Sequence, residues 1–243
     1  MPLHSINPAC WPPLSPSGFA PPSCPLYTKT SHYKVNLMEL VSVNVAVPKV
    51  VNINGKDVLT GIYKTPVQEA TWVKLLGVDG DNQADKKVHG GPHQAVYCYP
   101  SEHYDFWQGT LSQKDLSAAT FGENFTTFGL NESNLFIGDV FQIGEAAFQV
   151  TMPRIPCFKL VHKLGDKTMI KQFLHSGRSG FYCRVPKEGK VKAGDAINMV
   201  NRDQQAISVH TALILYKLDL NLLNNPAEIF IKALSIEGLP PLL

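Results

Sequence analysis

Hydrophobic and polar residues alternate with a period of two along most of the chain after Met38, which is typical of strands with one buried face. Residues 40–47 alternate and are rich in β-branched side chains, and residues 56–63 follow an Asn54-Gly55 turn, so we expect the domain to open with a hairpin. Many short strands separated by Gly, Pro, Asn and Asp indicate a barrel or a sandwich. The further predicted strands are residues 72–76, 95–99, 124–128, 140–143, 147–150, 181–185 and 196–200.

Helical patterns are few and short. Ser101 and Asp166 are each positioned to cap a helix, and Pro226 suits the first turn of another. The predicted helices are residues 102–108, 167–175, 209–217 and 226–235.

The chain divides into three parts by composition. Residues 1–37 hold eight of the 18 prolines and show no hydrophobic period, so we interpret them as a disordered or non-native leader, with Met38 as a plausible true start. The alternative is a real plastid or regulatory tail. Residues 38–203 form the predicted β domain, and residues 204–243 a C-terminal helical segment. The leader lacks the apolar core of a signal peptide and the arginines of a mitochondrial presequence.

Charge and cysteine content exclude several classes of protein. The leader carries two of the 22 Lys and Arg residues and none of the 20 Asp and Glu residues, so the body is neutral, which argues against a nucleic-acid-binding surface. Five cysteines without a C-x-x-C pair suit a reducing compartment, and apolar stretches fall short of the roughly 18 residues of a membrane span. We therefore predict a cytoplasmic protein that binds neither nucleic acid nor membrane.

The segment around Cys157 is the strongest candidate for chemistry. Two prolines stiffen the backbone there, and the cysteine has Arg154 three residues before it and Lys159 two residues after it. Nearby positive charge favours the thiolate, which attacks electrophiles or binds a soft metal. The alternative is that Cys157 packs in the core as a small hydrophobic residue.

Three other segments could bind an anion or move a proton. The turn with Lys87, His89, Gly90 and Gly91 offers charge and free backbone amides, although it could equally be a plain tight turn. The glycine turn before residue 181 has Arg178 before it and Arg184 after it, although arginines also form ordinary surface ion pairs. A further turn carries the carboxylate of Glu123 and the amide of Asn124, although both residue types are also common in ordinary turns.

Together and in this order, these motifs resemble the MOSC family, named for the C-terminal domain of molybdenum cofactor sulfurase, and its YiiM-like branch, the 6-N-hydroxylaminopurine resistance proteins. The resemblance covers the chain from about Met38 onward. It implies a MOSC-type β-barrel with short helices, a C-terminal helical segment that stops short here of the family's third helix, and a molybdenum cofactor (molybdopterin). It also implies reduction of N-hydroxylated bases and related compounds to amines, with electrons from a flavin-containing reductase. A homodimer is one possible assembly.

The resemblance also implies roles for the candidate residues. Cys157 is the expected molybdenum ligand and catalytic residue. We hypothesise that the oxygen of an N–OH substrate passes to reduced molybdenum and that His89 or Glu123 delivers a proton. The alternatives are a carrier that holds a persulfide on Cys157, and a barrel that binds the cofactor without turnover. The expected cofactor-binding residues are Lys87, Gly90, Gly91, Asn124, Arg154, Lys159, Arg178 and Arg184.

Overall fold

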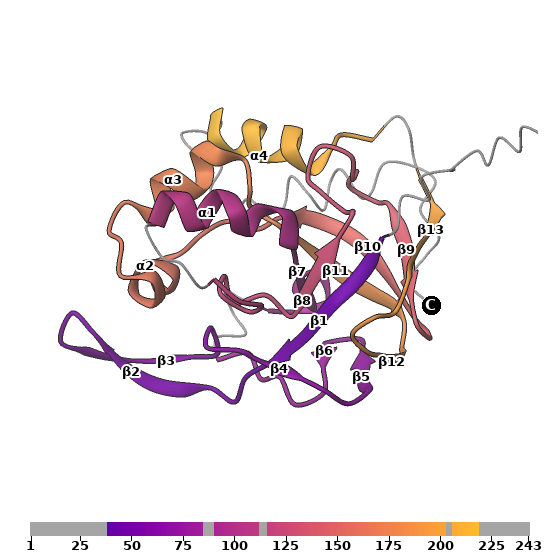
Figure 1. The fold of residues 1–243 in the computed structure, drawn as a ribbon, viewed down its shortest axis with the longest axis horizontal. Coiled ribbons are helices and arrows are strands. Elements are labelled where there is room, and N and C mark those ends of the chain that lie inside the picture. Colours follow the sequence, from indigo (N-terminus) through magenta and orange to yellow (C-terminus); the bar gives the residue numbers. More distant parts are fainter. Residues whose placement is uncertain (1–37, 85–89, 112–115, 203–205, 219–243) are drawn as a thin grey trace, which may run out of the picture. The chain divides into compact units, whose positions relative to one another are not determined.

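A mixed eight-stranded sheet is the main feature of the fold (Figure 1). The computed structural model describes residues 38–84, 90–111, 116–202 and 206–218, all of which belong to one compact unit. The strand order is β13-β9-β10-β11-β7-β8-β1-β4, and every pairing is antiparallel except that of β7 with β8. The prediction of a mainly β protein is thus confirmed. The strands are β1 (Glu39–Val45), β4 (Thr65–Val67), β7 (Val96–Pro100), β8 (Phe125–Phe128), β9 (Val140–Ile143), β10 (Ala146–Pro153), β11 (Phe181–Lys187) and β13 (Ile197–Asn201).

The hairpin around Asn54 and Gly55 has different strands from those predicted. Its strands are β2 (Lys49–Ile53) and β3 (Lys56–Thr60), and both turn residues have a positive φ, as a two-residue hairpin turn requires. Residues 40–47 instead supply β1, which pairs with β8 and β4. The prediction was wrong because Pro48, which has no N–H, ends the first run of alternation and a second run begins at Lys49.

A third, smaller sheet has the order β12-β5-β6, with β5 at Thr71–Lys74, β6 at Gly77–Val78 and β12 at Gly189–Val191. Two hydrogen bonds link strands from opposite ends of the strand order of the main sheet. The N–H of Leu40 on β1, which lies beside the edge strand β4, donates to the carbonyl of Asp195 (2.9 Å), and the N–H of Ile197 on the other edge strand, β13, donates to that of Met38 (2.8 Å). These bonds make an isolated bridge between β1 and the segment entering β13. No closed barrel is found in the described part of the chain, so the predicted barrel closure is not confirmed.

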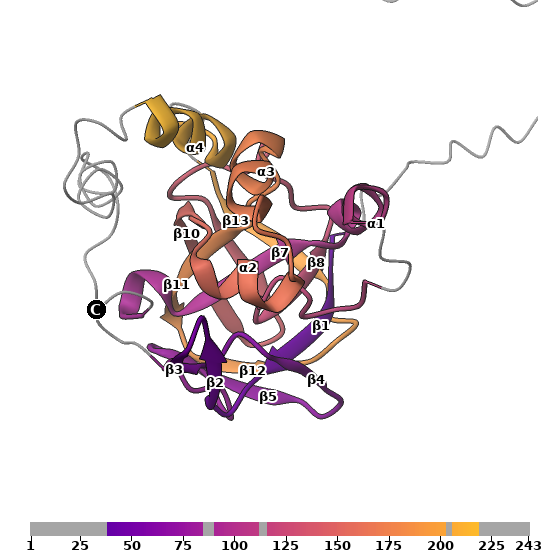
Figure 2. The same cartoon turned by 90° about the vertical axis from the view of Figure 1, so that its left-hand side faces the viewer.

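Four α-helices accompany the sheet: α1 (Tyr104–Leu111), α2 (Phe158–Leu164), α3 (Met169–Ser176) and α4 (Val209–Leu218). Short 3₁₀ turns, η1 (Pro92–Gln94) and η2 (Ser101–His103), precede β7 and α1. Helices α1, α2 and α3 gather at one end of the sheet, opposite β9, β12 and β13, and Figure 2 views this end face on (Figures 1 and 2). None of the described helices is long and apolar enough to cross a bilayer.

Three of the four predicted helices are confirmed with shifted boundaries, and the fourth, residues 226–235, lies outside the described residues. Helix α3 begins later than predicted because the Asp166 carboxylate accepts the Thr168 N–H (2.8 Å) in a turn before the helix. Helix α2 was not predicted, since its N-cap is Cys157, which offers no capping oxygen.

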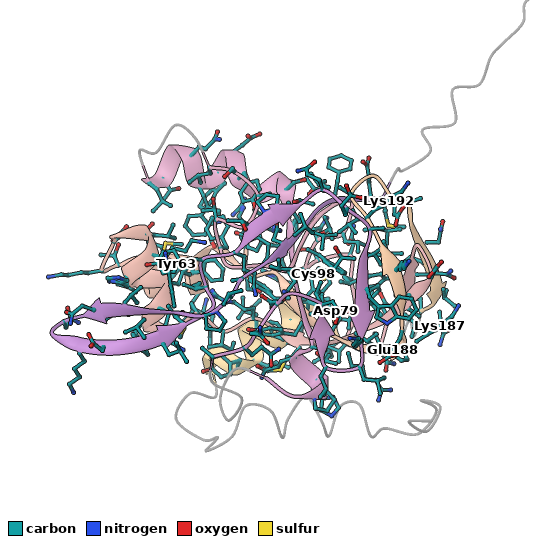
Figure 3. All side chains as sticks on the ribbon, turned by 90° about the horizontal axis from the view of Figure 1, so that it is seen from below. Tyr63, Asp79, Cys98, Lys187, Glu188 and Lys192 are labelled. Carbon is teal, nitrogen blue, oxygen red and sulfur yellow. The ribbon has the colours of Figure 1, made fainter. Side chains whose placement is uncertain are left out.

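The two faces of β7 pack into two different cores. Val96 and Cys98 belong to the main core between the strands, and Figure 3 shows Cys98 in the interior. Tyr97 and Tyr99 point the other way, into an aromatic core that Trp107, Phe121 and Phe173 complete beneath α1 and α3. The candidate site lies at the edge of this second core.

Candidate functional site

A pocket of about 110 Å³ lies where β7, the end of β10 and the start of α2 meet the segments after β3 and β6. It brings together four of the sequence-predicted site residues: Asn124, Arg154, Cys157 and Lys159. Residues distant in the sequence complete the wall. The full lining is Thr60, Gly61, Ile62, Lys64, Asp81, Asn82, Gln83, Ala84, Gln94, Tyr97, Gly122, Asn124, Arg154, Ile155, Cys157, Lys159 and Tyr182.

Cys157 occupies the turn between β10 and α2. It is half-buried, lies at the N-cap of α2 with an extended backbone, and its carbonyl accepts the Leu160 N–H (3.0 Å). Arg154 and Lys159 line the same pocket as the sequence predicts. The thiol is therefore accessible from the pocket and has positive charge nearby, the setting in which a cysteine becomes a nucleophile or metal ligand.

Arg154 is buried, with 5% of its surface exposed. Its guanidinium carbon lies 5.2 Å from the ring centroids of both Tyr97 and Phe173, and its backbone N–H donates to the Gly180 carbonyl (3.2 Å). The Nη1 atom is buried and has no hydrogen-bond partner within the described residues. Leaving a buried charged donor unpaired is costly, so this atom favours an acceptor or anion brought by a ligand.

Lys64 and Asp81 form a buried ion pair in the pocket wall. The Asp81 carboxylate also accepts hydrogen bonds from the Ala46 N–H (2.8 Å) and from the Asn124 side-chain amide (2.8 Å), and the side-chain Oδ1 of Asn124 accepts one from the Tyr97 N–H (3.2 Å). Asn124 thus lines the pocket as predicted, but the oxygen and the nitrogen of its side-chain amide both already make hydrogen bonds within the wall.

Two lysines near this wall have lowered pKa values. Burial lowers the pKa of Lys64, although the Asp81 carboxylate opposes the shift. Burial likewise lowers the pKa of Lys163 to about 8; the Glu123 carboxylate opposes this, whereas Lys64 and Arg154 add to it. The Lys163 ammonium donates to the carbonyls of Ile62 (2.9 Å) and Ala119 (2.6 Å), so a second cation lies directly behind the wall.

Tyr97 and Tyr182 are neighbours on β7 and β11, with ring centroids 5.3 Å apart. Burial raises the pKa of both phenols above the ordinary value, with the Arg154 charge opposing it, so both hydroxyls stay protonated. They give the pocket a neutral aromatic floor beside the arginine.

Glu123 does not line the pocket, although the sequence suggested it as a proton donor. It is fully buried, and its carboxylate accepts the N–H groups of Ala119 (2.8 Å) and Phe121 (3.0 Å) and the hydroxyls of Thr126 (3.2 Å) and Tyr104. Ala119 has a φ of 72°, an uncommon conformation for a residue with a side chain. The Glu123 carboxylate therefore stabilises the loop that contains Ala119 and Phe121.

Several other predicted cofactor-binding residues also lie outside the pocket. The Arg178 guanidinium stacks on Phe106, 4.0 Å from the ring centroid, and donates to the Ser176 carbonyl (3.3 Å). The Arg184 side chain donates to Gln149. Gly90 and Gly91 precede η1, and Gly91, with a φ of 89°, borders a separate hollow. Lys87 and His89 lie outside the described residues, so their roles stay predictions.

Sequence reasoning missed Lys64, Asp81, Tyr97 and Tyr182. The two tyrosines alternate with core residues along β7 and β11, which is a usable signal for the opposite face of the sheet. Lys64 and Asp81 carry no local signal, because only the folded chain brings their segments beside Cys157.

Comparison with known proteins places this site in a family. The sequence model of the MOSC domain matches residues 85–198. The chain is 44% identical over 173 residues to the uncharacterised protein YflK of Bacillus subtilis, covering 71% of this chain and 78% of that protein. The chain belongs to the MOSC domain family. To protein YiiM of Escherichia coli, this MOSC protein is 38% identical over 161 residues, covering 65% of this chain and 72% of that one.

Two further relatives bear on the fold and the chemistry. A protein of Gibberella moniliformis named "Reductase" is 31% identical to this MOSC protein over 175 residues, which are 70% of this chain and 31% of that one. The crystal structure of YiiM from Geobacillus stearothermophilus matches with a TM-score of 0.63 at 32% identity, covering 82% of this chain and all of that one. The predicted membership of the MOSC family and its YiiM-like branch is thus confirmed.

Proposed function

We propose that this MOSC protein binds a molybdenum cofactor in the pocket, with Cys157 as the protein ligand to the metal, and reduces N-hydroxylated bases and related compounds to amines. The observation that carries the proposal is the buried, unpartnered Nη1 of Arg154 in the same pocket as the Cys157 thiol. An anion-seeking donor beside a soft ligand suits a cofactor that combines phosphate with a soft metal.

The donor set fits such a cofactor better than a bare metal ion. No group of three or more His, Cys, Asp and Glu side chains that could hold a metal occurs within the described ranges. A metal that brings most of its ligands on an organic group needs only one from the protein, and Cys157 can supply it. Arg154 and Lys159 would hold the anionic part, with Tyr97 beneath the organic part.

The reaction consumes two electrons and two protons for each N–O bond broken, and it releases water. The cofactor supplies the electron chemistry when bound. Among the described cations that line the pocket, Lys64 has its pKa lowered by burial, which favours it as a proton source, with Asp81 holding it in place. Tyr97 and Tyr182 limit the entry of water from the sheet side.

The name of one relative supports the same class of reaction, because that protein is named a reductase. The substrate 6-N-hydroxylaminopurine is what the resemblance to the YiiM-like branch implies.

The experiment is reduction of 6-hydroxylaminopurine with chemically reduced methyl viologen as the electron donor, two molecules for each N–O bond, using protein made in a host that synthesises molybdenum cofactor. Arg154→Ala is expected to lower turnover on the order of tenfold or more, since it removes a charge-assisted contact. Arg178→Ala is the matched control, because its guanidinium lies on Phe106 outside the pocket, and it should stay within about twofold of wild type. Full turnover in Arg154→Ala, or none in the wild type, would overturn the proposal.

A further inference from the structure

Positive charge is concentrated in the segment from Phe158 to Arg178, which forms α2, α3 and the turn after them. This segment has five Lys and Arg residues and one acid, Asp166, which leaves 17 of the chain's 22 basic residues against 19 of its 20 acidic ones elsewhere. The cations recur every fourth position at Lys159, Lys163, Lys167 and Lys171. A chain that is otherwise slightly acidic thus has one basic unit, directly after Cys157.

The basic residues divide between the pocket and the surface. Lys159 and Lys163 point inward, one to the pocket and the other to backbone carbonyls. Lys167 and Lys171 are exposed, and so are the side chains of His162 and His175.

The single acid of this segment is satisfied locally. The Asp166 carboxylate accepts both the N–H and the hydroxyl of Thr168 (2.8 and 2.7 Å) and the side-chain amide of Gln172 (3.0 Å), and these bonds lower its pKa. The carboxylate therefore stays ionised in the turn, and its negative charge offsets one of the segment's five positive charges.

Two exposed aromatic side chains border the basic surface. Phe158, half of whose surface is exposed, directly follows Cys157, and Phe106 on α1 lies under the Arg178 guanidinium. Exposed aromatic and arginine side chains are the types that dominate binding energy at protein interfaces. The exposed acids Glu102 on η2 and Asp105 on α1 precede Phe106 in the chain and limit the basic area on that side.

We propose that the exposed side chains of the segment from Phe158 to Arg178, together with Phe106 of α1, form the docking surface for an acidic electron-carrier protein. They are Phe158 on α2, Lys167 in the turn between the helices, Lys171 and His175 on α3, and the Arg178–Phe106 pair. The inference rests on the proposed function, because each N–O bond cleaved needs two electrons from outside the chain. The donor is a reduced flavoprotein, oxidised by two electrons per turnover in one step or as two one-electron donors, and the two protons end in the amine and water.

The position of the surface favours a redox partner over other acidic ligands. Helix α2 starts at the residue after Cys157, so a protein seated on it comes close to the expected metal ligand. Opposite charges steer two proteins together and fix their orientation while letting them separate quickly, as a donor that must leave after each turnover requires. Nucleic acid is less favoured, because the exposed cations are few and the ionised Asp166 directly precedes Lys167 in the chain.

The test compares two electron donors and two charge reversals. The donors are reduced flavodoxin, an acidic FMN protein, and reduced methyl viologen, a small cation that needs no docking surface. The test variant is Lys167→Glu with Lys171→Glu. The matched control is Lys187→Glu with Lys192→Glu, two exposed lysines at the end of the sheet away from Tyr63, the residue that marks the α2 end (Figure 3).

The test variant should lose on the order of tenfold in kcat/KM with flavodoxin, mainly through KM, and stay within about twofold with viologen. The control should match wild type with both donors, and added salt should slow only the flavodoxin reaction of the wild type. Equal losses in both variants, or wild-type protein active with viologen and inactive with flavodoxin, would overturn the docking surface.

A binding measurement separates this proposal from the proposed function. The affinity for oxidised flavodoxin, followed by FMN fluorescence, needs no turnover and should fall only in the test variant. If viologen gives no turnover but this binding pattern holds, the proposed function fails and the docking surface stands. Tighter binding of a DNA duplex than of flavodoxin at the same face would overturn the docking surface in favour of nucleic acid.

Discussion

The Lys64 ammonium forms a buried ion pair with the Asp81 carboxylate in the wall of the pocket that holds Cys157. Asp81 also receives hydrogen bonds from Ala46 and Asn124, so one carboxylate joins the segments that follow β1 and β3 to the residue that precedes β8. The pair keeps the wall electrically balanced and leaves Arg154 and Lys159 as the cations available to a ligand.

Breaking this pair should destabilise the fold strongly. Asp81→Asn leaves Lys64 as a buried cation without its partner, and we expect the free energy of unfolding to fall by about 3 kcal/mol. Asp79→Asn is the matched control, because the Lys74–Asp79 pair has side chains 57% and 46% exposed, and it should cost under about 1 kcal/mol. Urea unfolding of both variants measures the difference, and equal losses would contradict the assignment.

Gly180 is expected to tolerate no side chain. Its φ is 65°, and a Cβ there would lie 2.4 Å from the Cys98 carbonyl oxygen and 2.8 Å from the Tyr97 ring. Its carbonyl also accepts the Arg154 N–H, so a displaced backbone would move the guanidinium. We expect Gly180→Ala to cost about 3 kcal/mol or more.

Gly194→Ala provides the comparison, since its φ is also positive, at 88°, but no atom lies within 4 Å of the added Cβ. It should cost only the backbone strain, about 1 kcal/mol. The thermal unfolding midpoints of the two variants test this prediction. Equal decreases in the two midpoints would contradict it.

Glu123→Gln separates a structural role from a catalytic one. The glutamine amide would place its NH₂ group against backbone N–H groups that now donate hydrogen bonds to the carboxylate. We therefore expect the free energy of unfolding to fall by about 1–3 kcal/mol. Turnover per folded molecule should stay within about twofold of wild type, because the side chain does not reach the pocket. A variant as stable as wild type but inactive would instead support the proton donor predicted from the sequence.

Lys163 should make stability depend on alkaline pH. The folded protein releases its proton near pH 8, whereas the unfolded chain keeps it to about pH 10.5, so the unfolded state holds more protons between these values. Below pH 8 the folded protein bears the whole free-energy cost of burying the Lys163 charge. Between pH 8 and 10.5 the free energy of unfolding therefore rises with pH.

We expect the unfolding free energy of wild type, relative to Lys163→Met, to rise by at most about 3 kcal/mol between pH 8 and 10.5. Subtracting the variant removes the contribution of other groups that titrate in this range. Parallel stability curves for the two proteins would show that Lys163 keeps an ordinary pKa.

Most of the longer strands were predictable from their alternation, but β2, β4, β6 and β12 were not, and neither were the partners of the strands. Pro48 separates two alternating runs that looked like one strand, and the parallel pairing of β7 with β8 has no local signature. Helix α2 escaped prediction because Cys157 at its N-cap offers no capping oxygen.

The site was predictable only where it is local in the chain. Arg154, Cys157 and Lys159 lie within six residues of one another, and the pocket holds all three. The residues that were predicted because they lie beside glycine turns are not all in the pocket. The side chains of Arg178 and Glu123 point away from it, because a turn does not specify the direction of the side chains next to it. Lys64 and Asp81 are far from Cys157 in the sequence, and only the pairing of distant strands brings them to the pocket.

The most direct test of the account is the molybdenum and pterin content of wild type and Cys157→Ala, each purified from a host that makes the cofactor. Cys98→Ala is the control, because it removes a thiol that lies buried in the main core. The account predicts near-stoichiometric molybdenum with pterin in the wild type and the control, and its loss in Cys157→Ala. Wild-type protein without molybdenum, with cyanide-releasable sulfur on Cys157, would contradict the account and support a sulfur carrier.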